Sequence, residues 1–196
     1  MFGFKVRLGS IKLFTCFFII DLWMLSLGRL GLALWQGERV SQADGWMHLL
    51  LQGLRVDVST LCWLLGVPMV LSLLLGGENR LGKVWLWGMR GLLVASTLLL
   101  LFMELSTPAF INTYDLRPNR IFVEYLSYPQ NIASMLLKGH LAAVVVVFAV
   151  LPLAAWALWR FSAYISRASA YPNVYWRPVL ALAVLLIAFL GARSSL

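Results

Sequence analysis

Charged residues are scarce in this chain of 196 residues: Asp, Glu, Lys and Arg make up 12% of it, while 61% is hydrophobic. A soluble domain carries about a quarter charged residues, so this composition excludes an ordinary soluble fold. Acidic residues are the rarer sign, with 8 Asp and Glu against 16 Lys and Arg, which leaves a net charge of +8. In so apolar a chain, the extra cations set membrane topology and meet anionic lipid. No nucleic-acid partner is predicted.

Metal-ligating side chains are also few. Cys16 and Cys62 lie inside apolar runs without a CxxC spacing, so neither a disulfide framework nor a zinc site is predicted. His48 and His140 stand at ends of apolar runs with no carboxylate at ligand spacing. The chain also lacks a nucleophile beside a base and a glycine-rich phosphate loop. We therefore assign no catalytic residue and no metal site to it.

Long apolar runs take up most of the chain. A transmembrane helix needs about 20 apolar residues to cross about 30 Å of hydrocarbon. Five runs meet or approach this length, at about residues 13–35, 49–75, 85–105, 141–159 and 178–192. The first follows basic residues as a signal peptide would, but its apolar run is too long and no small-residue cleavage site follows. The predicted fold is an all-α integral membrane bundle of about five transmembrane helices.

The placement of lysine and arginine in the loops predicts the orientation of these helices. The amino terminus, the second loop and the fourth loop carry basic clusters, namely Lys5, Arg7 and Lys12, then Arg80 and Lys83, then Arg160, Arg167 and Arg177. The first and third loops balance their cations with acidic residues. We therefore expect a cytoplasmic amino terminus, with the first loop, the third loop and the carboxyl terminus facing outward.

The densest polar segment lies between the third and fourth runs, where residues 107–129 read TPAFINTYDLRPNRIFVEYLSYP. Pro108 and Pro118 disfavour helix in the residues before them, so residues 106–117 are expected to be extended or turned. After this stretch, apolar residues recur at helical spacing, which predicts short helices lying along the interface. The loop is therefore expected to rest on the membrane surface.

Two arginines of this loop are candidate ligands for a lipid head group. The guanidinium fork matches a phosphate, and aromatic neighbours suit an interfacial position, so Arg117 and Arg120 are the preferred contacts. Arg120 and Glu124 are four residues apart and can pair on one helix. An alternative is that both arginines pair with Asp115 and Glu124 and only hold the loop in shape.

Six ionisable residues lie within the apolar runs: Asp21, Arg29, Arg55, Asp57, Arg90 and Glu104. A charge in hydrocarbon costs several kcal/mol unless it is paired or hydrated. Four of them, Arg29, Arg55, Asp57 and Glu104, lie within roughly 12 Å of the outer surface at about 1.5 Å per residue, and we expect one cluster there.

Within this cluster, Arg55 and Asp57 are two residues apart and point in different directions. We expect Arg29 to pair with Asp57, and Glu104 or the third loop to serve Arg55. Such pairs can bind lipid, or they can simply lock the helices together. Arg90, near the inner face, is expected to snorkel, and Asp21 receives no role.

Two motifs resemble one protein family. The first is the run at residues 104–129, with TP-AF, YD-RPNR-F, EYL and YP in order, and the second is GLRVD at residues 53–57. Both resemble the membrane region of Gram-negative members of the lipoteichoic acid synthase-like family. That family includes the phosphoglycerol transferases acting on periplasmic glucans and belongs to the sulfatase and alkaline phosphatase superfamily. Val56 replaces the usual aromatic residue, and Asn112 and Thr113 stand where relatives often carry an acidic residue.

The resemblance covers most of the chain and implies an amino-terminal domain in the bacterial inner membrane, followed by a periplasmic catalytic domain. In such proteins a threonine nucleophile and a divalent metal, usually manganese or magnesium, move a phosphoglycerol group from phosphatidylglycerol. None of that machinery is visible in this sequence. Because the last apolar run is short and ends near the outer face, we expect a soluble outer domain to follow.

The resemblance and the charge pattern together suggest roles. Arg55, Arg117 and Arg120 are expected to bind the phosphate of an anionic phospholipid, with positioning or ion-pair roles for Arg29, Asp57, Glu104, Asp115 and Glu124. One alternative is a small transporter, although five spans give no even inverted repeat and no matching pair of broken helices. Another is a non-catalytic scaffold subunit. Ion flux in proteoliposomes would favour the transporter, and a co-purifying enzyme would favour the scaffold.

Overall fold

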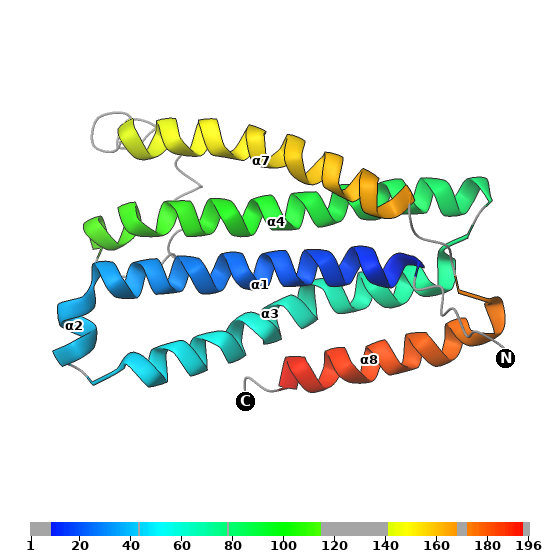
Figure 1. Cartoon of the computed structure of the whole chain (residues 1–196), viewed down its shortest axis with the longest axis horizontal. Helices are drawn as coiled ribbons and strands as arrows, with labels where there is room; N and C mark the ends of the chain where they lie inside the picture. Colours follow the sequence, from blue (N-terminus) through cyan, green and yellow to red (C-terminus); the bar gives the residue numbers. More distant parts are fainter. Residues whose placement is uncertain (1–8, 43, 78, 115–140, 168–171, 194–196) are drawn as a thin grey trace, which may run out of the picture. The chain divides into compact units, whose positions relative to one another are not determined.

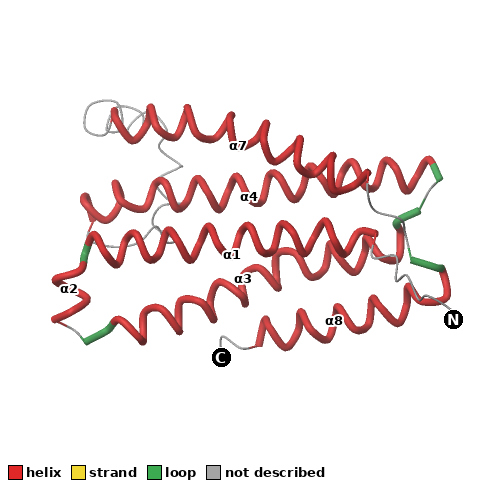
Figure 2. Tube along the Cα trace, in the orientation of Figure 1, coloured by secondary structure: helices red, strands yellow, loops and turns green. Residues whose placement is uncertain are grey.

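Helices form all the regular structure in the part of the chain that the computed structural model describes, which is residues 9–42, 44–77, 79–114, 141–167 and 172–193. The long helices are α1 (Gly9–Trp35), α3 (Trp46–Leu75), α4 (Arg80–Tyr114), α7 (Leu141–Arg167) and α8 (Arg177–Arg193). Two short ones, α2 (Gly37–Gln42) and the 3-10 helix η1 (Val174–Trp176), join them (Figure 2).

Five helices are long and apolar enough to cross a membrane. Each of the five apolar runs predicted from the sequence falls inside one of the long helices. The predicted all-α membrane bundle is therefore confirmed. The interfacial helices expected between the third and fourth spans lie outside the described residues, because residues 115–140 are not described.

The chain divides into two compact units, one made of residues 1–97 with 158–196 and the other of residues 98–157. In the first unit, α3 contacts both α1 and α8. The helices α1 and α3 run in opposite directions and are joined by α2 (Figure 1). The central helix of this unit is therefore α3.

One face of α1 is buried along its length. Its buried residues are Leu13, Phe14, Phe17, Asp21, Leu25, Arg29 and Ala33. They recur every three or four residues, the period that places side chains on one side of a helix. Trp23, Leu27 and Leu34 point to the other side and are more than half exposed. Large apolar side chains in that position are suited to lipid.

The helices α3 and α8 pack antiparallel. The hydroxyl of Ser59 donates to the carbonyl oxygen of Ala192 at 2.8 Å, near one end of the contact. Near the other end, Nη1 of Arg177 donates to the carbonyl oxygen of Gly76 at 2.6 Å. These two bonds fix the register of α8 on α3.

Small residues allow this close approach. A Cβ placed on Gly66 would lie 2.8 Å from the Cβ of Ala188, and one on Gly191 would collide with the sulfur of Cys62. Any larger residue at either position would clash, so only glycine lets α8 and α3 approach this closely. Small residues at helix contacts are typical of membrane bundles, because dispersion packing and not water exclusion holds the helices together.

The connection between α1 and α3 is a closed turn. Gly45 N–H donates to the carbonyl of Val40 at 3.1 Å, and Asp44 adopts a left-handed conformation with φ of 47°. Aspartate tolerates this conformation better than most residues do. The indole of Trp46 donates to the hydroxyl of Ser41 at 3.0 Å. These bonds tie the first residue of α3 to α2.

The structure corrects one expectation about the third loop. Residues 106–117 are not extended as far as they are described, because α4 continues through Pro108 to its end at Tyr114. Proline removes one backbone hydrogen bond, but in lipid every other backbone group still needs a partner, so the helix persists. The hydroxyls of Ser106 and Thr107 also donate to carbonyls four residues earlier, at 2.8 and 2.7 Å.

Candidate functional site

Four of the residues expected to bind or position lipid lie on described helices. Arg29 is on α1, Arg55 and Asp57 are on α3, and Glu104 is on α4. The other four lie outside the described residues: Asp115, Arg117, Arg120 and Glu124. The first three described residues belong to the first compact unit, and Glu104 belongs to the second.

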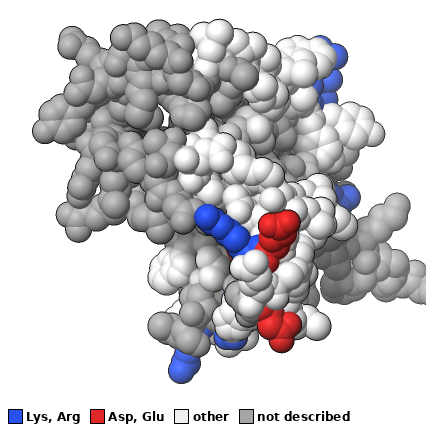
Figure 3. All heavy atoms as spheres, turned by 90° about the vertical axis from the view of Figure 1, so that its left-hand side faces the viewer, with Lys and Arg blue, Asp and Glu red and all other residues white. Residues whose placement is uncertain are grey.

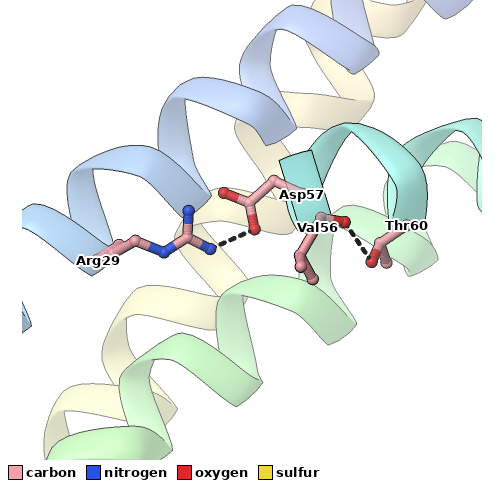
Figure 4. A network of polar contacts seen from close by, with 4 residues as sticks. All are labelled: Arg29, Val56, Asp57 and Thr60. Atoms are coloured by element: carbon pink, nitrogen blue, oxygen red, sulfur yellow. Dashed lines mark hydrogen bonds and ion pairs between the residues drawn. The ribbon is translucent and has the colours of Figure 1, made fainter. Parts of the chain in front are cut away.

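Arg29 and Asp57 form a buried ion pair between α1 and α3, so the pairing predicted from the sequence is confirmed. Nη2 of Arg29 donates to Oδ1 of Asp57 at 2.6 Å, and the two side chains are 10% and 7% exposed. Figure 4 shows the guanidinium reaching across from α1 to the carboxylate on α3. A charge-assisted bond this short, away from water, is among the stronger polar contacts in a protein.

Gly53 makes room for the arginine of this pair. A Cβ on Gly53 would collide with Nη1, Cζ and Nε of Arg29, so the guanidinium lies directly against the backbone of α3. Gly53 and Asp57 are four residues apart and share one face of the helix. The first and last residues of the GLRVD motif therefore build one receptor, in which glycine supplies the space and aspartate the charge.

The second carboxylate oxygen of Asp57 lacks a hydrogen-bond donor among the described residues. Oδ2 is buried, and no described residue gives it a hydrogen bond. A buried acceptor without a donor costs free energy, so the pair is held by a single strong bond and not by a bidentate fork. The carboxylate consequently depends heavily on Arg29.

Arg55 points away from this pair. Asp57 is buried while Arg55 is exposed, as expected for residues two apart on a helix. The neighbouring Thr60 is also exposed, and its hydroxyl donates to the carbonyl of Val56 at 2.8 Å, within its own helix (Figure 4). The ion pair thus orients α3 so that Arg55 lies on the outside of the α1–α3 contact.

Glu104 is half-buried on α4, one turn before Pro108. Because proline has no N–H, the backbone carbonyl of Glu104 loses its usual helical donor. This places a polar break in the hydrogen-bond ladder beside an acidic side chain.

The two ends of the first unit differ in charge. The turn between α1 and α3 carries Glu38, Arg39 and Asp44, and the face on which α2 lies shows both acidic and basic side chains (Figure 3). The opposite ends of the helices carry only cations among the described residues, namely Lys12, Arg80, Lys83, Arg167 and Arg177. The contacts of Arg177 with Gly76 and of Trp85 with Ser72 bring those helix ends together.

Arg90 has a role that the sequence did not reveal. Its Nε donates to the hydroxyl of Ser162 at 3.1 Å and its Nη2 to the carbonyl of Trp159 at 3.3 Å. Its guanidinium carbon also lies 4.6 Å from the centre of the Trp159 ring, and Trp87 meets the same ring edge to face. Arg90 therefore fastens α4 to α7, and the snorkelling expected from the sequence stays a prediction. An arginine within an apolar run indicates that it needs polar partners. These partners could not be identified from the sequence, because they lie about 70 residues away along the chain.

Among the described residues, no group of three or more His, Cys, Asp and Glu side chains is arranged to hold a metal ion. What the described site can do is hold one buried charge pair and present an exposed arginine beside it. No protein-family model matches the chain, and no solved structure matches it either.

Proposed function

We propose that this chain is the membrane domain of a lipid-dependent phosphoglycerol transferase, which anchors the enzyme and helps bind its phospholipid donor at the outer leaflet of the bacterial inner membrane. The observation that carries the proposal is the GLRVD motif on α3. Its glycine and aspartate hold Arg29 in a buried pair, while its arginine faces outward. The resemblance of this motif and of residues 104–129 to the lipoteichoic acid synthase-like family supports the same reading.

The division of labour within the motif follows from burial. Arg29 already forms an ion pair with Asp57, so we do not assign it to a lipid phosphate. Arg55 lies on the exposed side of α3, where a guanidinium reaches the phosphate level of a bilayer. We assign phosphate contact to Arg55, together with Arg117 and Arg120 of the third loop. Glu104, Asp115 and Glu124 then position these arginines.

The charge asymmetry supports the proposed orientation. The helix ends that carry only described cations match a cytoplasmic surface under the positive-inside rule. The end with Glu38, Arg39 and Asp44 is then periplasmic, and α8 runs toward that side, with Ala192 beside Ser59 of α3. A catalytic domain joined after α8 would face the periplasm. The family resemblance implies that manganese or magnesium would belong to that domain.

Lipid binding by the purified chain tests the proposal. Native mass spectrometry would count bound phosphatidylglycerol and phosphatidylcholine on the wild type, on Arg55→Ala and on Arg80→Ala, which removes an equal charge at the other end. A surface arginine near an anionic lipid is worth about 1 kcal/mol, so Arg55→Ala should weaken phosphatidylglycerol binding about fivefold. Arg80→Ala removes one of several cations at the other end of the helices, so it should weaken this binding less than Arg55→Ala does.

The same substitutions can then be placed in the native protein and assayed for phosphoglycerol transfer, together with Arg117→Ala and Arg120→Ala. Reduced transfer with unchanged membrane insertion is the expected result for Arg55→Ala, Arg117→Ala and Arg120→Ala, while Arg80→Ala serves as the control. Equal lipid binding by the Arg55→Ala variant and the wild type, with unchanged transfer in Arg55→Ala, Arg117→Ala and Arg120→Ala, would overturn the lipid site. If the intact protein extracted from its source membrane has the 22.0 kDa mass of this chain, the scaffold and transporter alternatives would be favoured over the transferase.

A further inference from the structure

Asp21 is the most deeply buried ionisable residue among those described. Its exposed fraction is 0%, and it lies roughly 15 to 20 Å from either end of the α1 span at about 1.5 Å per residue. Neither carboxylate oxygen has a hydrogen bond of standard geometry to a described residue. Burial at this depth removes the carboxylate from bulk water, which disfavours its charged form.

The group that faces Asp21 is the hydroxyl of Thr97 on α4. This hydroxyl is also buried, with an exposed fraction of 2%, and it too has no hydrogen bond of standard geometry. The two carboxylate oxygens of Asp21 and the hydroxyl oxygen of Thr97 therefore form a buried polar cluster. Buried polar atoms in folded proteins are nearly always hydrogen-bonded, so these atoms are expected to bond to one another.

The nearby described cations are already engaged. On α1, Arg29 is two turns away and bonded to Asp57. On α4, Arg90 is two turns from Thr97 and bonded to α7. The part of α7 that approaches α1 does so through an aromatic contact, between Phe161 and Phe17. Along α3, the residues after Asp57 include no acidic or basic side chain.

We propose that Asp21 is a proton-binding site, a neutral carboxylic acid inside the membrane that donates its O–H to Thr97. One proton turns the carboxylate into a group that both donates and accepts, so it satisfies its own oxygens and the hydroxyl opposite. An ionised carboxylate at this depth would need a counterion, and a buried acid without one neutralises instead. Three oxygens are too few to surround a metal cation such as magnesium or calcium.

Infrared spectroscopy of the protein in lipid tests this proposal, because a protonated carboxyl has a carbonyl stretch that a carboxylate lacks. At neutral pH, we expect a carboxylic-acid band in the wild type that shifts in heavy water and disappears in Asp21→Asn. Asp57→Asn is the matched control, since Asp57 accepts the ion-pair bond of Arg29 instead, and this variant should keep the band.

Loss of the band in Asp57→Asn but not in Asp21→Asn would overturn the proposal, and so would a wild type with no band. If Asp21→Asn does not fold, Thr97→Val provides the second test. Without the hydroxyl to accept its hydrogen bond, the carboxylic-acid band should move to higher frequency. An unmoved band in Thr97→Val would show that the proton is not shared with Thr97.

Discussion

Breaking the Arg29–Asp57 pair on one side should cost the bundle much of its stability. Both side chains are at most 10% exposed, so a lone charge would stay out of water. Removing one partner of a buried pair costs about 3–5 kcal/mol. We expect about 3 kcal/mol for Asp57→Asn, at the lower end because the pair lies in the outer half of its helices. This loss is more than a hundredfold in the unfolding equilibrium constant, at about 1.4 kcal/mol per factor of ten.

The two single variants should differ. Arginine cannot give up its proton, so Asp57→Asn leaves a permanent buried cation. Arg29→Met leaves a carboxylate, which can take up a proton and become neutral. Arg29→Met should therefore be less damaging than Asp57→Asn, and the double variant should be less damaging than the sum of both.

Equilibrium unfolding in mixed micelles measures the free energy of unfolding of each variant, with the fluorescence of the 9 tryptophans of the chain as the signal. Thr60→Val is a suitable control on the same helix, because Thr60 is exposed and its hydroxyl donates to the carbonyl of Val56 within α3. Its effect should stay within about 0.5 kcal/mol, as for ordinary surface substitutions. Strictly additive effects of the two single variants would refute the coupling.

Further substitutions probe the space that Gly53 leaves for Arg29 and the contacts of Arg90. Gly53→Ala places a methyl group against the guanidinium of Arg29 and should destabilise the bundle in the same unfolding measurement. Gly31→Ala is the control, because a Cβ at Gly31 meets nothing within 4 Å, and it should be neutral or stabilise the bundle by up to about 1 kcal/mol. Equal effects of the two would contradict the role of Gly53 in making room for Arg29. Arg90→Lys keeps the charge but loses the fork that reaches Ser162 and Trp159, so thermal unfolding should begin at a lower temperature, and an unchanged transition would show that the contact carries no stability.

The transmembrane spans were predictable from the sequence because burial in lipid acts on each helix separately. An apolar run of sufficient length is stable there whatever its neighbours are. The pairing of Arg29 with Asp57 was predictable for a related reason: few charges lie at that depth, and each needs an opposite sign. The helix through Pro108 was not foreseen, because the rule that proline ends helices comes from water, where the freed carbonyl can be solvated.

The sequence by itself determined the all-α membrane class, the five spans and the presence of charges near one end, since these depend on composition and local order. Only the tertiary structure decided which side chains meet. It placed the backbone of Gly53 against Arg29, the carboxylate of Asp21 opposite Thr97, and the guanidinium of Arg90 against Ser162 of α7. Those contacts join residues from 24 to 76 positions apart, and they depend on the rotation and register of each helix. The packing of small residues at helix contacts sets this rotation and register. The spacing of residues along a single helix carries no information about how that helix packs against another.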